Sequence, residues 1–369
     1  MQARKYILAI FLTIFLLSNT AFTVDAASGL PNSPEFGYGA RISTYGQQLT
    51  QALAIAPSLG LDWIAVNFDW ARQWPDPEVE PDLSTLVGLM ASARQNNLHI
   101  LASISNPPAW AMTPAGPNPD VTTALTLRLV SSDPSSLLVI ELFPGANTVR
   151  GWGTTPNPEA YIGVIQKARN ALTNQNYQTY VIPSFSPLSA TPAAGEIDDL
   201  TFLAKFYEAG MATPIVGLRY QDIPGQPFSE PTPREPGVLR HYELLRNFML
   251  QNNHRTDLIW ITGFSWPNHL STMEEQAIWV HDAYKLLKAQ LYIGAAFFNS
   301  LNPSSPEDFF YSSSSLVLAD GSLHPAATQL SNITSNTGES IDTLLAVPQT
   351  QKGIIKKHSH KTIVKRPSS

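Results

Sequence analysis

The sequence predicts an α/β protein built as a single (β/α)8 barrel. Short apolar stretches alternate with stretches of helical periodicity along roughly 300 residues, which is about the length of such a barrel. The apolar stretches lack strand-like alternation, as expected for parallel strands that are covered on both faces. An open, doubly wound sheet is the alternative fold, but no glycine-rich phosphate loop follows an early strand. In a barrel, the functional site would lie at the carboxyl ends of the strands.

The strands and helices alternate regularly from the beginning to the end of the predicted barrel. Predicted strands cover residues 36–39, 63–68, 99–104, 137–142, 180–183, 215–220, 258–262 and 291–298. Predicted helices cover residues 47–59, 83–95, 121–130, 158–172, 197–209, 238–250, 273–287 and 324–333. Gly60 and Gly210 directly follow two of these helices, and Pro158 begins another, as is typical of helix ends and starts.

The two ends of the chain differ from the barrel between them. Residues 1–26 have the pattern of a secretory signal: the basic pair Arg4 and Lys5, an apolar run, and small residues before Ala27. An uncleaved anchor is the alternative, although the apolar run is short for a membrane span. We therefore expect a secreted, extracellular or cell-surface barrel over residues 27–335. Residues 336–369 are predicted to be a disordered basic tail.

Composition and charge exclude several classes of function. The chain has no cysteine, which rules out disulfides, zinc–thiolate sites and cysteine nucleophiles. The formal net charge is −6, and the tail is basic, so the barrel itself is acidic and unsuited to nucleic acid. Membrane contact is expected only through an uncleaved signal or the basic tail. The histidines lack metal-ligand spacing, so we expect no metal. We also expect no cofactor and a monomer.

Two strand ends carry the most informative motifs. Strand 137–142 runs into Phe-Pro-Gly-Ala-Asn with Gly145 in the centre, and strand 258–262 runs into Gly263-Phe-Ser-Trp. Together with the aromatic segments after the other strands, these ends resemble the clan-A glycoside hydrolases, especially cellulase-like and xylosidase-like members, over roughly residues 36–333. In that family the two strand ends carry the acid/base glutamate and the nucleophilic glutamate. The resemblance places Gly145 and Gly263 at these two positions.

Glycoside hydrolysis requires two carboxyl groups flanking the scissile bond, one protonated and one ionised. Glycine supplies no proton, charge or nucleophile, so the resemblance implies that hydrolysis by the family mechanism is lost. Three acids near strand ends could instead act as relocated catalytic groups. These are Glu141 at the end of the fourth strand, Asp69 after the second and Asp222 after the sixth.

Aromatic residues after the strands indicate a carbohydrate ligand, because sugar rings present apolar C–H faces to which aromatic rings can pack. The predicted substrate-binding residues are Trp70, Trp110, Asn147, Trp152, Tyr220, Phe264 and Trp266. The leading hypothesis is an inactive barrel that binds carbohydrate or a partner. The alternatives are an active glycosidase with relocated acids and a structural, partner-binding barrel. An open groove exposing Trp110, Trp152 and Trp266 would favour sugar binding, and a filled mouth the structural role.

Overall fold

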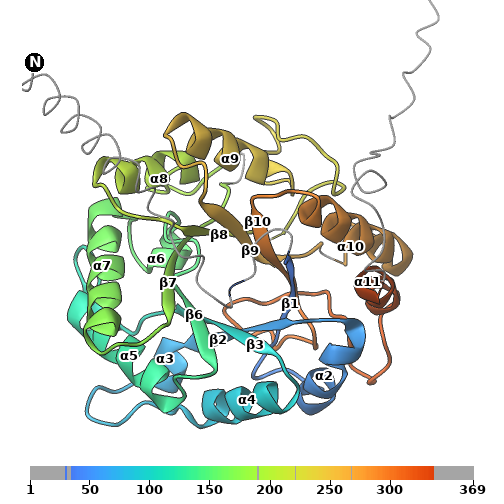
Figure 1. Ribbon diagram of the computed structural model, residues 1–369, viewed down its shortest axis with the longest axis horizontal. Coiled ribbons are helices and arrows are strands. Elements are labelled where there is room, and N and C mark those ends of the chain that lie inside the picture. Colours follow the sequence, from blue (N-terminus) through green and yellow to red (C-terminus); the bar gives the residue numbers. More distant parts are fainter. Residues whose placement is uncertain (1–29, 31–34, 189–190, 221, 267, 336–369) are drawn as a thin grey trace, which may run out of the picture.

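Eight parallel strands form a closed barrel surrounded by helices in the computed structural model (Figure 1). The structure describes residue 30 and residues 35–188, 191–220, 222–266 and 268–335, so the predicted signal and basic tail lie outside the described residues. Around the barrel, β1 is followed by β10, β9, β8, β7, β6, β3 and β2, which pairs again with β1. The strands are β1 (Gly37–Arg41), β2 (Trp63–Asp69), β3 (His99–Ser105), β6 (Leu137–Leu142), β7 (Tyr180–Phe185), β8 (Ile215–Arg219), β9 (Leu258–Phe264) and β10 (Ile293–Asn299). The predicted (β/α)8 barrel is confirmed, and the open doubly wound sheet is wrong.

The helices between the strands lie close to their predicted positions. They are α2 (Leu49–Ile55), α4 (Ser84–Gln95), α5 (Pro119–Ser132), α7 (Pro158–Asn174), α8 (Asp199–Glu208), α9 (His241–Gln251), α10 (Met273–Lys288) and α11 (Pro325–Ser335). The segment predicted as one helix over 47–59 divides into α2 and the 3-10 turn η1 (Ala56–Leu59), which has proline in its first turn. Gly60, with a φ of 70°, ends that turn in the left-handed conformation, as its position predicted.

Short elements inserted after the strands build the mouth of the barrel, and they were not predicted from the sequence. They are α3 (Trp70–Gln73), η2 (Ala109–Ala111), the hairpin strands β4 (Met112–Thr113) and β5 (Gly116–Pro117), and α6 (Val149–Trp152). Each is too short to give a periodic pattern, and local caps hold them instead. Asp69 caps α3, for example, and Thr148 caps α6.

Alternation along the strands divides the barrel interior into an apolar layer and a polar layer. Ala65, Val139, Ile182 and Trp260 belong to an apolar cluster nearer the strand starts. Because side chains alternate between the two faces of a strand, the residues two positions later return to the interior, nearer the mouth. Those positions hold polar residues, as in Glu141 after Val139. The apolar layer therefore closes the barrel near the strand starts, and the polar layer lies between it and the mouth.

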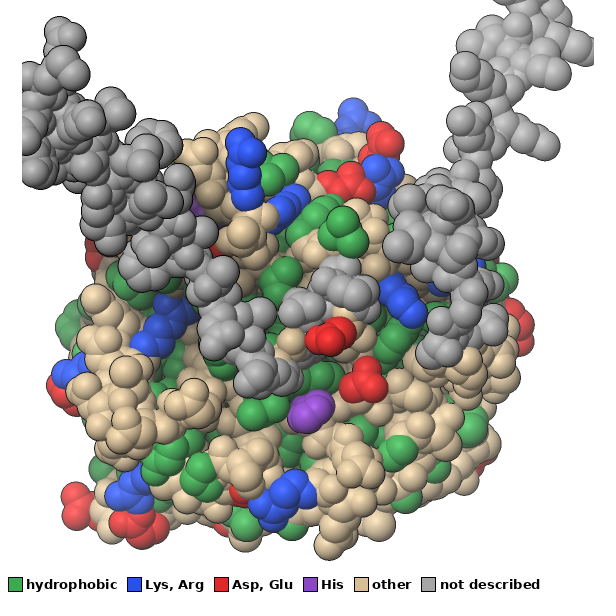
Figure 2. All heavy atoms as spheres, viewed as in Figure 1, with side chains coloured by type: hydrophobic (Ala, Val, Ile, Leu, Met, Phe, Trp, Pro, Cys, Tyr) green, Lys and Arg blue, Asp and Glu red, His purple; other side chains and the backbone are tan. Residues whose placement is uncertain are grey.

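Charged side chains are spread over the molecular face seen in Figure 2, where basic and acidic groups alternate with apolar and neutral ones among the described residues. Within the described ranges, no helix has the length and apolar character needed to cross a bilayer. Any strong local field must therefore come from a particular arrangement of a few side chains rather than from the surface as a whole.

Candidate functional site

A layer of polar residues, one from each barrel strand, lies beneath the mouth. Its members are Arg41, Asn67, Ser103, Glu141, Ser184, Arg219, Thr262 and Asn299. All except Asn67 are buried, including the three charged residues. Burial of charge is costly unless each charge is paired, so the contacts within this polar layer determine what the site can do.

Glu141 is held by Arg41 and Ser103. The Ser103 hydroxyl donates to Glu141 Oε2 over 2.5 Å, and Arg41 Nη2 lies 3.5 Å from the same oxygen. Burial lowers the pKa of Arg41 to about 10, although the neighbouring Glu141 carboxylate opposes that shift. Glu141 Oε1 and the Nε and Nη1 of Arg41 are buried without a hydrogen-bond partner. Glu141, one of the three acids predicted as relocated catalytic groups, is thus buried in the barrel and forms an ion pair with Arg41.

Arg219 fills the place beside Gly263. A Cβ added at Gly263 would lie 2.2 Å from Arg219 Nη1, far inside van der Waals contact. Strand β9 bulges here, because Leu218 pairs with Ile261 while the next residue, Arg219, pairs with Gly263. The Thr262 carbonyl accepts from Arg41 at 2.9 Å and from Arg219 at 3.4 Å. The Arg219 guanidinium therefore occupies the space that a side chain at position 263 would need.

Gly145 lies in a turn that a larger residue would strain. Its φ is 72°, in the left-handed region, and an added Cβ would approach Ser186 Oγ to 2.7 Å. Asn147 fastens this turn: its amide donates to the carbonyls of Ser186 and Ile197, and its side-chain oxygen accepts from the Ser186 N–H. Asn147, a predicted ligand residue, thus uses its side-chain amide for hydrogen bonds to the protein's own backbone.

Phe310, from the loop after β10, covers both buried arginines. Its ring centroid lies 3.6 Å from the guanidinium carbon of Arg219 and 4.7 Å from that of Arg41. Burial, and then the nearby Arg41, lower the pKa of Arg219 well below its ordinary value. Arg150 lies over the adjacent Phe309 and donates to its carbonyl over 2.5 Å. The centre of the mouth is therefore closed by a phenylalanine stacked on cations.

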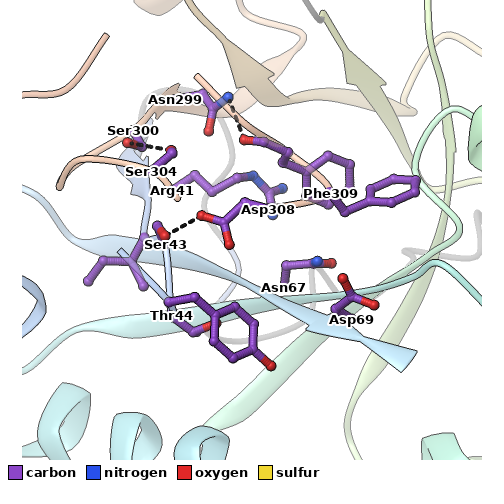
Figure 3. Close-up of a pocket in the computed structure, with 13 residues that line it drawn as sticks. Arg41, Ser43, Thr44, Asn67, Asp69, Asn299, Ser300, Ser304, Asp308 and Phe309 are labelled. Atoms are coloured by element: carbon purple, nitrogen blue, oxygen red, sulfur yellow. Dashed lines mark hydrogen bonds between the residues drawn. The ribbon is translucent and has the colours of Figure 1, made fainter. Parts of the chain in front are cut away.

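A small cavity of about 20 Å³ remains beside this closure, with room for one water-sized group. Figure 3 shows Arg41, Asn67, Asn299 and Asp308 around it, with Asp69 at its edge. Asp308 accepts from the Ser43 hydroxyl and from the Ser305 N–H. The cavity thus brings Asp69 near a second carboxylate that the sequence did not single out.

Asp69 and Asp222, the other two acids predicted as relocated catalytic groups, lie in different parts of the mouth. Asp69 caps α3 and accepts from Asn106 Nδ2 over 2.8 Å; burial raises its pKa, while these hydrogen bonds oppose the shift. Asp222 is exposed and lines a different cavity, beyond β8. Among the described residues no hydrogen bond or ion pair joins Glu141, Asp69 and Asp222 to one another. Asp69 lines the small cavity and Asp222 the other one, and neither of these two cavities is lined by a second member of the three.

Most of the predicted aromatic ligands are packed inside the protein. Trp70, Trp152, Phe264 and Trp266 are at most 1% exposed, and Tyr220 is 2% exposed with its hydroxyl on the Leu239 carbonyl. Trp110 is half-buried, and its ring centroid lies 4.9 Å from that of Trp74 and 5.9 Å from that of Trp70. The loops thus use these rings as packing, and the mouth is filled rather than open around Trp152 and Trp266.

An open groove of about 550 Å³ lies to one side of the mouth, next to Gly145. Four of its lining residues adjoin the mouth: Thr148 and Ser186 lie beside Gly145, Arg150 lies over Phe309, and Tyr220 follows Arg219. We call these four the inner end of the groove and the remaining lining residues its outer part: Pro187, Leu188, Thr191, Ala193, Glu196, Asp222, Pro224, Arg234, Glu235, Pro236, Gly237 and Leu270. A groove of this volume, with mixed apolar and polar walls, is of the size that holds small ligands.

Sequence reasoning missed Arg41, Arg219 and Phe310. A signal was present for the two arginines, since each ends an otherwise apolar strand after a glycine two positions earlier, Gly39 and Gly217. Phe310 had no such signal, because its role depends on where a long loop crosses the mouth. Over the residues that the structure covers, no group of three or more histidine or acidic side chains could hold a metal ion.

Several solved structures that are similar to this fold are glycoside hydrolases. A family 39 glycoside hydrolase from the gut symbiont Bacteroides cellulosilyticus WH2 matches with a TM-score of 0.58 and 15% identity, covering 81% of this chain and 63% of that one. A GH39 beta-xylosidase from Caulobacter crescentus matches with a TM-score of 0.60 and 13% identity, covering 83% and 72%. A GH5_18 protein from Streptomyces cattleya in complex with GlcNAc matches with a TM-score of 0.63 and 13% identity, covering 83% and 81%.

These matches confirm the predicted resemblance at the level of the fold. The chain spans less than two thirds of the length of the Bacteroides protein. No protein-family model matches the sequence, and no curated protein matches it either.

Proposed function

We propose that this protein is a secreted barrel of the glycoside-hydrolase type that no longer hydrolyses glycosides and binds carbohydrate in the groove beside Gly145. The observation that carries the loss of catalysis is the guanidinium of Arg219 beside Gly263. Glycoside cleavage passes through an oxocarbenium-like transition state with positive charge on the sugar. A buried cation in place of a carboxylate would repel that charge as well as fail to attack the sugar.

The groove supports binding because its walls combine two kinds of contact. Pro187, Leu188 and Leu270 offer apolar surface, while Thr148 and Ser186 offer hydroxyls. Sugar rings need both, since their C–H faces pack on apolar groups and their hydroxyls both donate and accept. The GlcNAc complex of the Streptomyces cattleya protein makes carbohydrate a reasonable ligand class for a barrel of this shape.

The cellular location belongs to the same proposal and rests on the sequence alone. The signal pattern of residues 1–26 supports export, and the basic tail supports attachment to an anionic wall polymer or membrane surface. We further propose that the exported protein is a monomer without a cofactor. N-terminal sequencing of the protein from the culture medium would test cleavage near Ala26.

The binding half is tested by a glycan array with purified protein and a groove-filling variant. Thr191→Trp places a large side chain in the exposed outer part of the groove and should abolish retention of the bound glycan. Gln166→Trp, on the exposed face of α7, is the matched control and should bind as the wild type does. An array without any retained glycan would refute carbohydrate binding.

The catalytic half is tested with aryl glycosides. No turnover is expected from the wild type or from the Gly145→Glu/Gly263→Glu double variant, because Arg219 still occupies the site of attack. The alternative of an active glycosidase with relocated acids predicts turnover that is lost in Glu141→Gln, Asp69→Asn or Asp222→Asn. Such turnover would overturn the proposal.

A structural, partner-binding barrel is the second candidate function, and the buried state of Trp152 and Trp266 favours it. This candidate predicts that the groove has no glycan ligand while the fold remains stable. A negative array obtained with protein that unfolds cooperatively would favour this function over the first.

A further inference from the structure

Three arginines gather around the centre of the mouth with one carboxylate among them. Arg41 and Arg219 both lie against the Phe310 ring, Arg150 lies against the adjacent Phe309, and all but Arg150 are buried. Glu141 is the carboxylate in this cluster, and it is already bound to Arg41 and Ser103. Asp69 and Asp308 line the small cavity beside Arg41, so the positive charge without a carboxylate partner lies at Arg150 and at the buried Arg219.

Arg150 and Arg219 lack carboxylate partners among the described residues. The recorded polar partner of Arg150 is the Phe309 carbonyl, and that of Arg219 is the Thr262 carbonyl. A guanidinium presents five N–H donors in a fixed plane, and one carbonyl leaves most of them unused. Carboxylates are the groups that best match this donor plane, through two parallel hydrogen bonds.

The groove leads to this cluster. Arg150 is exposed and forms part of the groove's inner end, together with Ser186 and Tyr220, the residue that follows Arg219. The outer part of the groove holds Arg234 but also Glu196, Asp222 and Glu235. A ligand charged along its whole length would meet these acids, whereas a ligand with one carboxylate at its inner end would meet Arg150.

We propose that the groove binds a sugar bearing a single carboxylate, a uronic acid, with that carboxylate on Arg150 and with Arg219 behind it as a second positive charge. This inference rests on the proposed carbohydrate-binding function and names its ligand class. The rest of the ligand is neutral and lies along the apolar wall. Arg150 makes the direct contact, and Arg219 acts through the field it adds at the same place.

Titration calorimetry with matched disaccharides tests the proposal. Pairs that differ in one group, a neutral hexose or its uronic acid at the terminal ring, are compared in the glucose, galactose and mannose series. At least one uronic acid should bind about tenfold more tightly than its neutral counterpart, as expected for one charge-assisted contact. That preference should shrink as salt is raised, while neutral binding should not change. Acetate should compete weakly with the uronic acid.

Variants separate the two arginines. Arg150→Ala should remove the preference for the acid but leave neutral binding intact, and Arg150→Lys should restore part of it. Arg219→Met, close in shape and without charge, should reduce the preference. The control Arg255→Ala removes an exposed arginine in the loop before β9, at the opposite end of the barrel, and should bind as the wild type does.

The outcomes distinguish the two proposals. Equal affinity for neutral and acidic partners, unchanged by Arg150→Ala, would overturn the uronic-acid inference and leave carbohydrate binding standing. Failure of every sugar, neutral or acidic, to bind would overturn the proposed function itself. Because Arg150 is exposed, its variants should fold normally, and a melting curve for each checks this.

Discussion

A Cβ at position 263 would lie 2.2 Å from Arg219 Nη1, so the glycine and the arginine share one space. The arginine is 3% exposed and stacked under Phe310, which leaves its guanidinium little freedom to withdraw. Gly263 and Arg219, which are distant in the sequence, are thus one structural unit. A larger residue at position 263 would clash with the arginine unless the arginine is also replaced.

This coupling is measurable by a double-mutant cycle. Gly263→Ala should destabilise the protein by about 1–3 kcal/mol through overpacking, but should cost little in an Arg219→Ala background. Urea unfolding of the four proteins gives the coupling energy. Gly163→Ala on α7 is the control: an added Cβ there meets nothing within 4 Å, so a gain in stability is expected. Equal losses at position 263 in both backgrounds would show that the two residues do not share space.

The buried pair of Arg41 and Glu141 should be more important as a pair than as two residues. Glu141→Gln should lower stability by about 3–5 kcal/mol, because it leaves the Arg41 charge buried without a counter-ion. Arg41→Met/Glu141→Leu should recover much of that loss by replacing both charges with apolar groups. Chemical denaturation provides the measurement.

Glu80→Gln serves as the comparison, since the Glu80 side chain is 78% exposed where it pairs with Arg128, and its removal should change stability little. If Glu141→Gln lowered stability as little as Glu80→Gln does, Glu141 would not be the group that compensates the buried charge of Arg41.

Phe310 should protect the two buried arginines from reagents. Phe310→Ala removes the ring stacked on both guanidinium groups, at a cost of about 1–2 kcal/mol, and opens the mouth. Phenylglyoxal modification followed by peptide mass spectrometry should then detect Arg41 and Arg219, which the wild type shields. Phe228→Ala, at an exposed phenylalanine, should leave both arginines protected. Rapid labelling of Arg219 in the wild type would contradict this role.

His241 should make the protein more stable in mildly acidic solution. Burial alone would lower the pKa of His241, but the Asp199 carboxylate, 2.8 Å from Nε2, raises it above the ordinary value. Nδ1 lies 3.0 Å from the Pro236 carbonyl, so both ring nitrogens face acceptors and the doubly protonated ring fits best. Because the folded pKa is raised, this stabilisation is complete below about pH 6.5 and is lost as pH rises through the folded pKa.

Thermal unfolding of the wild type and of His241→Gln between pH 5.5 and 9 tests this. The difference in stability between the two proteins should narrow as pH rises. His269→Gln, at an exposed histidine, should run parallel to the wild type throughout. If the difference in stability between wild type and His241→Gln widened as pH rises, the raised pKa assigned to His241 would be wrong.

The tryptophans show where prediction from sequence stopped. Their positions after strand ends placed Trp70, Trp152 and Trp266 at the mouth of the barrel, and that is where the inserted turns α3 and α6 and the β9 loop hold them. Whether a ring faces a groove or a neighbouring loop depends on the loops that pack over it. The Trp152 indole donates to the Ala115 carbonyl and that of Trp266 to the Gly225 carbonyl, contacts between segments that have no common sequence pattern.

The sequence by itself determined the barrel and the absence of carboxyl groups at Gly145 and Gly263. Apolar strands joined by amphipathic helices have few ways to bury their faces, and the closed parallel barrel is one of them. Only the tertiary structure decided what lies beside Gly263. Arg41 and Arg219 come from distant strands, and Phe310 from a loop that follows the last strand. They meet because closing the barrel points alternate residues at one axis, and the bulge at Thr262 turns a carbonyl toward them.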